Sequence, residues 1–574
     1  MRKGRFSFLD FYARRIRRIF PALAVVLAAC LVGGAFILDP SEYKEFGLNV
    51  AAGAGFLSNA LMWSQAGYFD RVAEFKPLLH LWSLAVEEQF YFIWPLALFL
   101  WAQVRRPLWP LSVVFAVASF ALNLYLAEVD RVADFYFVLA RIWELLLGAG
   151  LTLAAPAALE GQTKVANAAA AAGLTLIVVS LLLTNNTQAF PGWRALGPTV
   201  GATLLIAAGP RAFLNARLFS NRLMVAIGKI SYPIYLWHWP LLAFARICAG
   251  GEVPPAPRWE MIALAVALSQ LTYVYVERPI RLGSFPARNA ALAAAAVAAL
   301  GLIGWRDFQV GGLFFPNATL AVVANEGDVG PDEFLKYLAT HSVPCDARLF
   351  SMTLLRGRDA PRCGQTYADR WPEVVILGDS HGEHLYMGVS EALPGRNVAW
   401  YAGGLPLVDE PTFKLIYEAL VAAPAVRAVI LSASWAGELK RQPAGTSLRA
   451  EIDRALRLLG ASGKVVYVAN DVPSFHFDAG RCKFSGRLGF PALCDEPEAA
   501  LDRQLATYEN DLKAAVEANP GAQLIDTAHM LCRGDTCSMA EDGKLLYRDD
   551  NHLNINGSRL IGARLVAAAP GIAE

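Results

Sequence analysis

The sequence predicts two structural classes in one chain: a multi-pass α-helical membrane domain, followed by a three-layer α/β/α domain with a parallel sheet. Of its 574 residues, 55% are hydrophobic and only 18% are charged, whereas soluble domains average about 25% charged residues. The mean hydropathy is +0.36. Asp and Glu are sparse before residue 310 and frequent after it. From about residue 371, strand-like and helix-like runs alternate.

Apolar stretches in the first part are candidate membrane crossings, because a spanning helix needs about 20 apolar residues. Nine stretches fit this length: 19–38, 84–103, 109–127, 135–155, 165–184, 195–210, 228–247, 259–276 and 287–306. A tenth stretch, 48–62, is weaker and contains two glycines, a serine and an asparagine.

The distribution of positive charge indicates that residues 48–62 do not cross. The first eighteen residues hold seven Lys and Arg residues, which places them in the cytoplasm by the positive-inside rule. If 48–62 is a re-entrant or surface-lying segment, Arg105 and Arg106 and the arginines near 211–222 and 278–288 also lie inside. Nine crossings then deliver the C-terminal domain to the outside.

Cysteine usage supports the same orientation. Six of the eight cysteines lie in the C-terminal region, and an even number in one domain suggests disulfides in an oxidising compartment. We expect sequential pairing, although six cysteines allow 15 pairings. The expected pairs are Cys345 with Cys363, Cys482 with Cys494 and Cys532 with Cys537. A zinc site is less favoured because no CxxC pair occurs.

Ionisable residues inside apolar stretches are costly and often functional. The candidates are Arg15 and Arg18 in an RxxR spacing, Glu87, Glu88, Arg141 and Glu144 at i,i+3, and His238 between two tryptophans. Structural alternatives stay open: topology anchors for the two arginines, a simple ion pair for Arg141 and Glu144, and an interfacial belt for the tryptophans. The net charge of +1 suggests no nucleic-acid partner.

Five strings in this half resemble the acyltransferase 3 family of membrane acyltransferases, which includes bacterial O-antigen acetyltransferases. They are FYARRIRRIFP (11–21), GYFD with KPLLHLWSLAVEEQFYFIWP (67–95), ARIWELLLGA (140–149), ISYPIYLWHWPLL (230–242) and YVERPIR (275–281). The resemblance implies a bacterial inner-membrane protein that transfers an acyl group, usually acetyl from cytoplasmic acetyl-CoA, to a glycan hydroxyl. It assigns Arg15 and Arg18 to the donor. We expect no tightly bound cofactor.

One departure from the family concerns the N-terminus. Such proteins normally begin with two more membrane helices, the first carrying an essential histidine, and none of the eight histidines here occupies that place. We therefore expect that these helices are missing from the chain as written, and we favour a misplaced start over a reduced catalytic site.

The C-terminal domain shows strand-like runs at 373–378, 427–433, 464–470 and 522–527, and helix-like runs near 382–393, 447–459, 497–518 and 556–568. This alternation predicts a parallel sheet covered by helices on both faces. The first strand ends in GDSH, which places Ser380 at the sheet edge where a helix begins. Asp549 and His552 stand near the C-terminus in YRDDNHLN. A serine, a histidine base and an orienting carboxylate are the parts of a hydrolase triad.

These strings resemble the SGNH hydrolase family, in the variety fused behind acyltransferase 3 domains. The resemblance implies an SGNH-like domain with Ser380 as nucleophile, His552 as base and Asp549 as orienting acid. Gly403 or Gly404 would contribute an oxyanion N–H. The family's third block, often GxND, is replaced here by LSASWAGE (431–438), so one donor is unassigned, and Asn470 is a poor substitute. His381 and His384 have no apparent third ligand, so we expect no metal site.

The predicted organisation is an acyltransferase domain at 1–286, a last crossing at 287–308, a linker at 309–335 and a periplasmic SGNH-like domain at 336–574. Our leading hypothesis is transfer of an acetyl group from acetyl-CoA across the bilayer to an envelope glycan such as lipopolysaccharide O-antigen. Two alternatives stay open. The outer domain could be an acetyl-glycan esterase, or the membrane half could be a transporter or scaffold that carries a glycan-binding domain.

Overall fold

A computed structural model of the chain describes residues 7–38, 40–65, 75–104, 107, 109–154, 163–185, 190–249, 253–284, 286–310, 319–320, 325–345, 362–440, 442, 447–485 and 493–572. The chain divides into two compact units, Met1–Pro316 and Asn317–Glu574. This division falls inside the predicted linker. The GYFD string and Arg105 and Arg106 lie outside the described residues.

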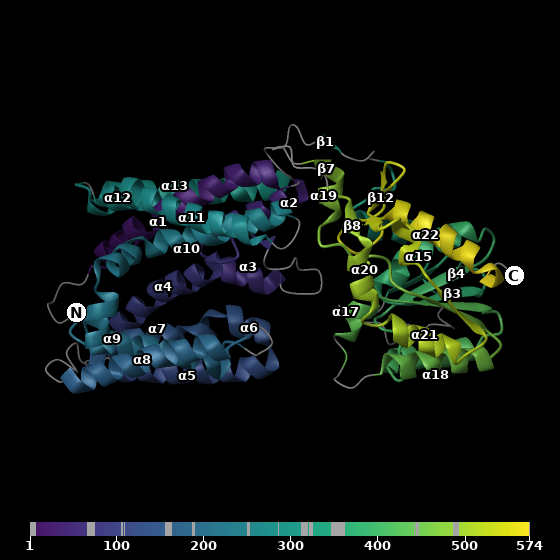
Figure 1. The fold of residues 1–574 in the computed structure, drawn as a ribbon, viewed down its shortest axis with the longest axis horizontal. Helices are drawn as coiled ribbons and strands as arrows, with labels where there is room; N and C mark the ends of the chain where they lie inside the picture. Colours follow the sequence, from purple (N-terminus) through teal and green to yellow (C-terminus); the bar gives the residue numbers. More distant parts are fainter. Residues whose placement is uncertain are drawn as a thin grey trace. The chain divides into compact units, whose positions relative to one another are not determined.

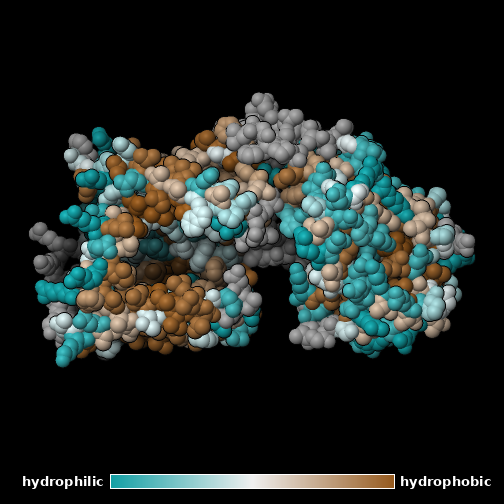
Figure 2. Space-filling view, in the orientation of Figure 1, coloured by the Kyte–Doolittle hydropathy of each residue, from teal (hydrophilic) through white to brown (hydrophobic). Residues whose placement is uncertain are grey.

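The first unit is helical (Figure 1). Its principal helices are α1 (Phe8–Ile37), α2 (Pro40–Ala54), α3 (Ser58–Gln65), α4 (Leu81–Gln103), α5 (Trp109–Val129), α6 (Arg131–Tyr136), α7 (Val138–Ala154), α8 (Thr163–Leu183), α9 (Leu196–Ala208), α10 (Arg222–Ala249), α11 (Pro255–Thr272), α12 (Arg278–Leu282) and α13 (Pro286–Val310). A π-helical turn, η4 (Tyr273–Glu277), joins α11 to α12. Hydrophobic side chains cover much of the outward face of this unit (Figure 2), as lipid contact requires.

Helices occupy all nine predicted crossings, but six of the described helices are long and apolar enough to span a bilayer: 8–37, 109–129, 131–152, 163–183, 255–282 and 286–310. Three of the nine predicted crossings therefore lack a helix that meets this criterion of length and composition. Helix α9 has only 13 residues. Helices α4 and α10 are long enough but are diluted by polar side chains, including Glu87 and Glu88 in α4 and Lys229 and His238 in α10.

The stretch 48–62 is not one helix. It covers the end of α2, a break in which Phe56 has a φ of 54°, and the start of α3. Helix α2 has 15 residues and α3 has eight, so neither is long enough to span a bilayer alone. Helix α2 packs tightly on α13, because a Cβ added to Gly47 would lie 2.6 Å from the carbonyl oxygen of Gly304.

The second unit is built on a six-stranded sheet in the order β2-β4-β3-β5-β6-β9. The strands are β2 (Arg362–Gln365), β3 (Val374–Gly378), β4 (Val398–Ala402), β5 (Ala428–Ser432), β6 (Val465–Ala469) and β9 (Ala522–Ile525). Five strands are parallel, whereas β2 pairs antiparallel with β4. The predicted parallel sheet is confirmed for these five strands, and the edge strand β2 makes the whole sheet mixed.

Residues of β3 alternate between two hydrophobic cores, as the two-residue period of a strand requires. Val374 and Ile376 face one core, and Val375 and Leu377 face the other. Helices α15 (Ser380–Ala392) and α22 (Ile555–Ala568) cover the first face, and α18 (Leu448–Ala461) and α21 (Glu509–Glu517) cover the second (Figure 1). The three-layer prediction is confirmed.

The predicted strand positions agree with β3, β5, β6 and β9 to within two residues at each end. The run predicted as one helix at 497–518 is two helices, α20 (Glu498–Leu505) and α21, separated at 506–508. Strand β4 and helix α16 (Pro411–Ala422) were not predicted. The structure contains the three sequentially paired disulfides.

Candidate active site

The candidate nucleophile, Ser380, is the first residue of α15 and follows β3 after one residue. Asp379 caps this helix, because its Oδ1 accepts the backbone N–H of His381 at 2.8 Å and the four N–H groups at a helix start have no partner within the helix. Only glycine fits at 378, since a Cβ there would overlap the carbonyl oxygen of Ser432 on β5. Residues 378–380 therefore form a tight strand-to-helix turn that presents the serine at the sheet edge.

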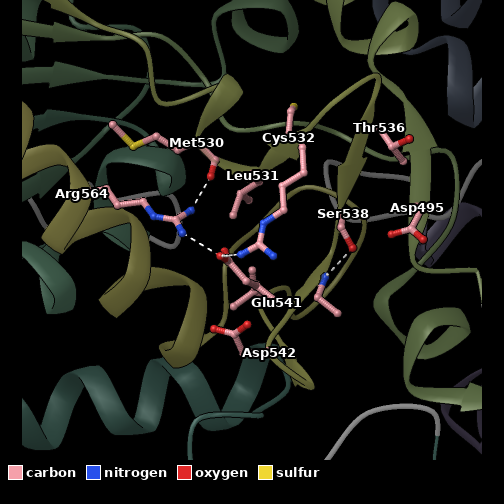
Figure 3. Close-up of a pocket in the computed structure, with 12 residues that line it drawn as sticks. Asp495, Met530, Leu531, Cys532, Thr536, Ser538, Glu541, Asp542 and Arg564 are labelled. Carbon is pink, nitrogen blue, oxygen red and sulfur yellow. Dashed lines mark hydrogen bonds and ion pairs between the residues drawn. The ribbon is translucent and has the colours of Figure 1, made fainter.

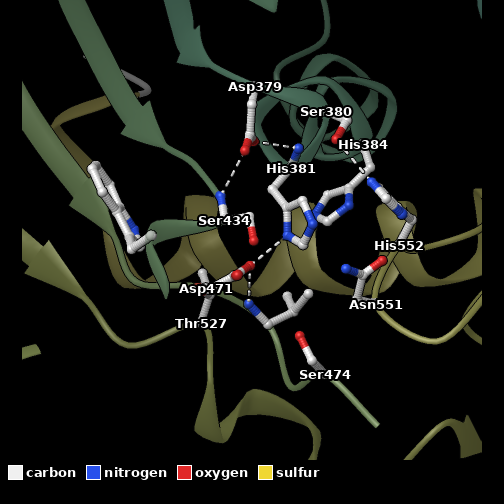
Figure 4. Close-up of polar contacts among 12 residues, drawn as sticks. Asp379, Ser380, His381, His384, Ser434, Asp471, Ser474, Thr527, Asn551 and His552 are labelled. Carbon is white, nitrogen blue, oxygen red and sulfur yellow. Dashed lines mark hydrogen bonds and ion pairs between the residues drawn. The ribbon is translucent and has the colours of Figure 1, made fainter. Parts of the chain in front are cut away.

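The structure brings the three predicted triad residues together. Ser380 Oγ lies 2.8 Å from His552 Nε2 (Figure 4). On the other side of the ring, His552 Nδ1 lies 2.9 Å from Asp549 Oδ2. Asp549 is itself fixed, because its Oδ1 accepts the backbone N–H groups of Asn551 at 3.0 Å and His552 at 2.6 Å. This geometry sets the imidazole to donate at Nδ1 and to accept the serine proton at Nε2.

The electrostatics suit a base that is neutral at neutral pH. Burial lowers the pKa of His552 to about 4, although Asp549 opposes the shift. Burial would raise the pKa of Asp549, but hydrogen bonds from His552 and Asn551 and the nearby charges of His552 and Arg548 lower it to about 2. Asp549 is therefore ionised and His552 is free to accept a proton.

The predicted oxyanion glycines follow β4 and contact the turn below Ser380. The N–H of Gly403 donates to the carbonyl of Gly378 at 2.7 Å, and that of Gly404 approaches the same oxygen at 3.3 Å. Gly404 has a φ of 117°, a conformation that favours glycine. Their role as oxyanion donors stays a prediction. The N–H of Ser380, at the start of α15, is a further candidate because a helix N-terminus stabilises negative charge.

The segment LSASWAGE (431–438), which stands where the family often has GxND, contacts the turn at 378–380. The backbone N–H of Ser434 donates to Asp379 Oδ2 at 3.0 Å, which ties the loop after β5 to the cap of α15. Asn470 is engaged elsewhere, since its amide donates to Asp526 Oδ1 at 3.1 Å and its carbonyl accepts from Ala528 N–H at 3.1 Å. This agrees with the expectation that Asn470 is a poor substitute for the family's asparagine.

In the first unit, α1 and α4 bring Arg15 and Glu87 close together. The Arg15 guanidinium lies 3.5 Å from the centroid of the Tyr91 ring, a cation–π contact. The Tyr91 hydroxyl donates to Glu87 Oε1 at 2.6 Å. Glu88 Oε1 is buried and has no hydrogen-bond partner among the described residues. The predicted residues Arg15, Glu87 and Glu88 therefore lie near one another between α1 and α4, together with Tyr91, which was not predicted.

Arg18 lines a different feature, a cavity of about 550 Å³ between the start of α1, the start of α10 and the η4–α12 segment. Its charged lining residues are Arg14, Arg17, Arg18, Lys229, Glu277 and Arg281. Five of these six side chains are cationic and one is anionic. Such a site favours an anionic ligand with several negative charges.

The other predicted membrane residues contact the beginning of α4. His238 Nδ1 lies 2.7 Å from the carbonyl oxygen of Tyr235, and its ring lies 5.7 Å from that of His80. Arg141 pairs with Glu144 at 3.1 Å and lies 5.5 Å from the ring centroid of Trp82.

His80 was not singled out from the sequence. It is buried, and neither ring nitrogen has a hydrogen-bond partner among the described residues. The sequence signal that could have identified His80 is its place in the string KPLLHLWSL, just before the apolar stretch 84–103. No group of three or more His, Cys, Asp or Glu side chains in the described part of the chain is arranged to hold a metal ion.

A second cavity, of about 480 Å³, lies in the second unit and includes none of the triad (Figure 3). Glu541 lies at its centre and pairs with both Arg533 and Arg564. Asp495 and Asp542 also line it, so the three acidic side chains outnumber the two arginines. This balance does not favour an anion.

Comparisons with known proteins find one family match in each half of the chain. Residues 1–275 match a family described as an acyltransferase domain, and residues 348–567 match the SGNH domain fused to AT3 domains. The protein named as membrane-bound transacylase BcsY of Komagataeibacter xylinus is 32% identical over 273 residues, which are 48% of this chain and 69% of that protein. Peptidoglycan O-acetyltransferase OatA of Listeria monocytogenes is 27% identical over 48% of this chain and 47% of its own.

The chain thus spans about half the length of that O-acetyltransferase. Among solved structures, the periplasmic domain of the lipopolysaccharide acetyltransferase of Salmonella ser. Paratyphi A matches with a TM-score of 0.26 and 14% identity, over 35% of this chain and 84% of that one. Together, the family matches and the BcsY similarity show that the chain belongs to the membrane acyltransferase family in which an acyltransferase domain is fused to an SGNH domain.

Proposed function

We propose that the chain transfers an acetyl group from acetyl-CoA to a hydroxyl of a cell-envelope glycan, and that Ser380 carries the group as an ester between the two. The observation behind this proposal is the assembled Ser380–His552–Asp549 triad in a chain whose other half is an acyltransferase domain. The acceptor we favour is lipopolysaccharide O-antigen. The peptidoglycan acetylation in the name of OatA makes peptidoglycan the other envelope glycan to test.

The serine step follows from the geometry. The first unit takes the acetyl group from acetyl-CoA and delivers it to Ser380. His552 Nε2 takes the proton of Ser380 as its oxygen attacks the acetyl carbonyl, the bond between the acetyl and the group that delivered it breaks, and the proton passes to that group. In the second half, the glycan hydroxyl attacks the acetyl-serine. His552 takes the proton of that hydroxyl and returns it to Ser380 Oγ. Each half returns His552 to its neutral form, and the second half restores the Ser380 hydroxyl, so the two halves together balance at the triad with no other reactant.

The basic cavity in the first unit supports acetyl-CoA as the acyl donor. Acetyl-CoA carries several phosphate charges, and a cluster that includes Arg18, Lys229 and Arg281 can pair with them. The basic residues of this cluster come from three separate helices, α1, α10 and α12. By the positive-inside rule this end faces the cytoplasm, where acetyl-CoA is available. We place the disulfide-bonded second unit in the periplasm, because disulfides persist in oxidising compartments.

The serine step is tested by measuring the O-acetyl content of envelope glycans by mass spectrometry, in deletion cells that carry the intact chain or its Ser380→Ala variant. Ser390→Ala is the matched control, since Ser390 lies on the same helix outside the triad and its hydroxyl donates to the carbonyl of Met387. Loss of acetylation with Ser380→Ala alone supports the relay. Increased acetylation would instead indicate an editing esterase, and unchanged acetylation would remove Ser380 from the route.

The donor site is tested in membrane vesicles with radiolabelled acetyl-CoA. Arg18→Ala should raise the apparent KM for acetyl-CoA roughly 10-fold or more, because a charged hydrogen bond contributes about 1.5–3 kcal/mol. Arg222→Ala is the control, since this exposed arginine starts α10 outside the cavity. Transfer that needs no acetyl-CoA in the wild-type vesicles would favour the transporter or scaffold alternative.

A further inference from the structure

A second histidine–aspartate pair lies beside the triad. His381, the residue after the nucleophile, has its Nδ1 2.6 Å from Oδ1 of Asp471, which follows β6. Both side chains are at most 1% exposed. Asp471 Oδ1 also accepts the backbone N–H of Val472 at 2.9 Å, which holds the carboxylate in place. Figure 4 shows this pair next to His552.

The His381 ring packs against two other imidazoles. Its centroid lies 4.7 Å from that of His552 and 4.9 Å from that of His384. At such distances a charge on one ring strongly disfavours a charge on the next. The three histidines therefore cannot all be protonated together, and their neighbours decide which one holds the proton.

Those neighbours favour His381. It faces the carboxylates of Asp471, Asp379 and Asp549, and although burial alone would lower its pKa, these charges raise it to about 9. Among the described residues, no carboxylate pairs with His384, and burial, His381, His552 and Arg548 all lower its pKa. Its Nδ1 accepts the backbone N–H of Leu553 at 3.4 Å, as a neutral ring can.

His552 is the third member of the cluster. It faces Ser380 Oγ on one side and the Asp549 carboxylate on the other, and the charges of Arg548 and His381 act against its protonation. His381 places its positive charge on the nucleophile's own helix, α15, with its ring 4.7 Å from that of His552.

We propose that His381, held by Asp471, is a positioning residue of the serine site: a fixed buried cation that keeps His552 neutral and speeds the return of its proton. His552 must accept a proton and release it in each half of the reaction. A cation beside its ring makes the release easier and keeps the base available at mildly acidic pH. The proposal rests on Ser380 being the acyl-carrying nucleophile, as set out above.

The test is the pH–rate profile for hydrolysis of p-nitrophenyl acetate by the purified full chain in detergent, between pH 4 and 9. His381→Gln should move the acid limb of kcat/KM to higher pH by about one unit or more, which is a loss of roughly tenfold in rate below that limb. Asp471→Asn should move it in the same direction, because His381 then loses the partner that keeps it charged. His384→Gln removes a neutral ring and should leave the limb in place.

Each outcome is informative. Lower rates with an unshifted limb in both variants would mean that the pair is merely structural and would overturn the proposal. If His381→Gln fails to fold, the nearly isosteric Asp471→Asn still gives the shift or its absence. A wild-type chain without Ser380-dependent hydrolysis would count against the proposed acyl-serine, whereas an active chain with unshifted variants would count against His381 alone.

Discussion

Replacing Asp549 with asparagine should nearly abolish catalysis while leaving the fold intact. The amide oxygen of asparagine can still accept the backbone N–H groups of Asn551 and His552 that Asp549 Oδ1 accepts now. Its NH2 group, however, would face His552 Nδ1. The ring would then accept at Nδ1 and carry its proton on Nε2, where it points at Ser380 Oγ and cannot act as a base. The matching change in a serine-protease triad lowers kcat about 10⁴-fold, or roughly 5.4 kcal/mol of barrier.

The stability cost should be much smaller. The folded protein lowers the pKa of Asp549 from 3.8 to about 2, which corresponds to roughly 2–3 kcal/mol. Because this carboxyl pKa is depressed, the stabilisation is present above pH 3.8 and is lost as the pH falls towards 2. The asparagine variant should therefore lose roughly 2–3 kcal/mol of unfolding free energy at pH 7.

The assay is Ser380-dependent hydrolysis of p-nitrophenyl acetate by the full chain, with thermal unfolding measured in parallel. Asp502→Asn is the control for the same chemical change, at a site that is 64% exposed on α20. A loss of activity below about tenfold would refute the tautomer argument. A stability loss well above the activity loss would show that Asp549 supports the fold and not the base.

Three further predictions concern packing, protonation and cross-linking. Gly562→Ala should destabilise the second unit by about 1–3 kcal/mol in thermal unfolding, because the added Cβ would overlap the backbone of Gly388. Gly460→Ala, a helical site with no atom within 4 Å of the new Cβ, should be neutral or stabilising. The acid limb of Ser380-dependent kcat/KM should lie near pH 4, since His552 has a pKa of about 4 and must be neutral to act; a limb at 6.5 would contradict this. Cys482→Ser should cost about 2–4 kcal/mol, compared by unfolding with and without reductant.

Local patterns were enough to predict much of the second unit. The strands at β3, β5, β6 and β9 are short runs of branched residues, and the triad residues stand in short strings at the two ends of the domain. Strand β4 was not predicted because its five residues include aromatic and small side chains and do not form a run of branched residues. The antiparallel edge strand β2 depends on its pairing with β4, a long-range contact that no local pattern encodes.

The second histidine–aspartate pair shows a deeper limit. His381 was visible in the GDSH string, but Asp471 is 90 residues away and follows a strand that is not adjacent to β3. Only the strand order β3-β5-β6 brings the two chain segments to the same edge of the sheet. In the membrane half, apolar length alone did not separate α4 and α10 from the more uniformly apolar helices, because polar side chains such as Glu87 in α4 and His238 in α10 stand inside otherwise apolar runs.

The packing of two helices links the stability of the second unit to the geometry of its triad. Helix α15 begins with Ser380, and α22 begins three residues after His552. The two helices meet where the backbone of Gly388 lies against Ser558 and Gly562, with no room for a Cβ at either glycine. The Gly388 N–H also donates to Ser558 Oγ at 3.1 Å. Because the nucleophile and the base are each attached to one of these helices, a side chain that forces the helices apart also lengthens the 2.8 Å contact between Ser380 and His552. In Gly562→Ala, the barrier to Ser380-dependent hydrolysis should therefore rise by more than the free energy of unfolding falls, although the substitution lies far along α22 from the serine.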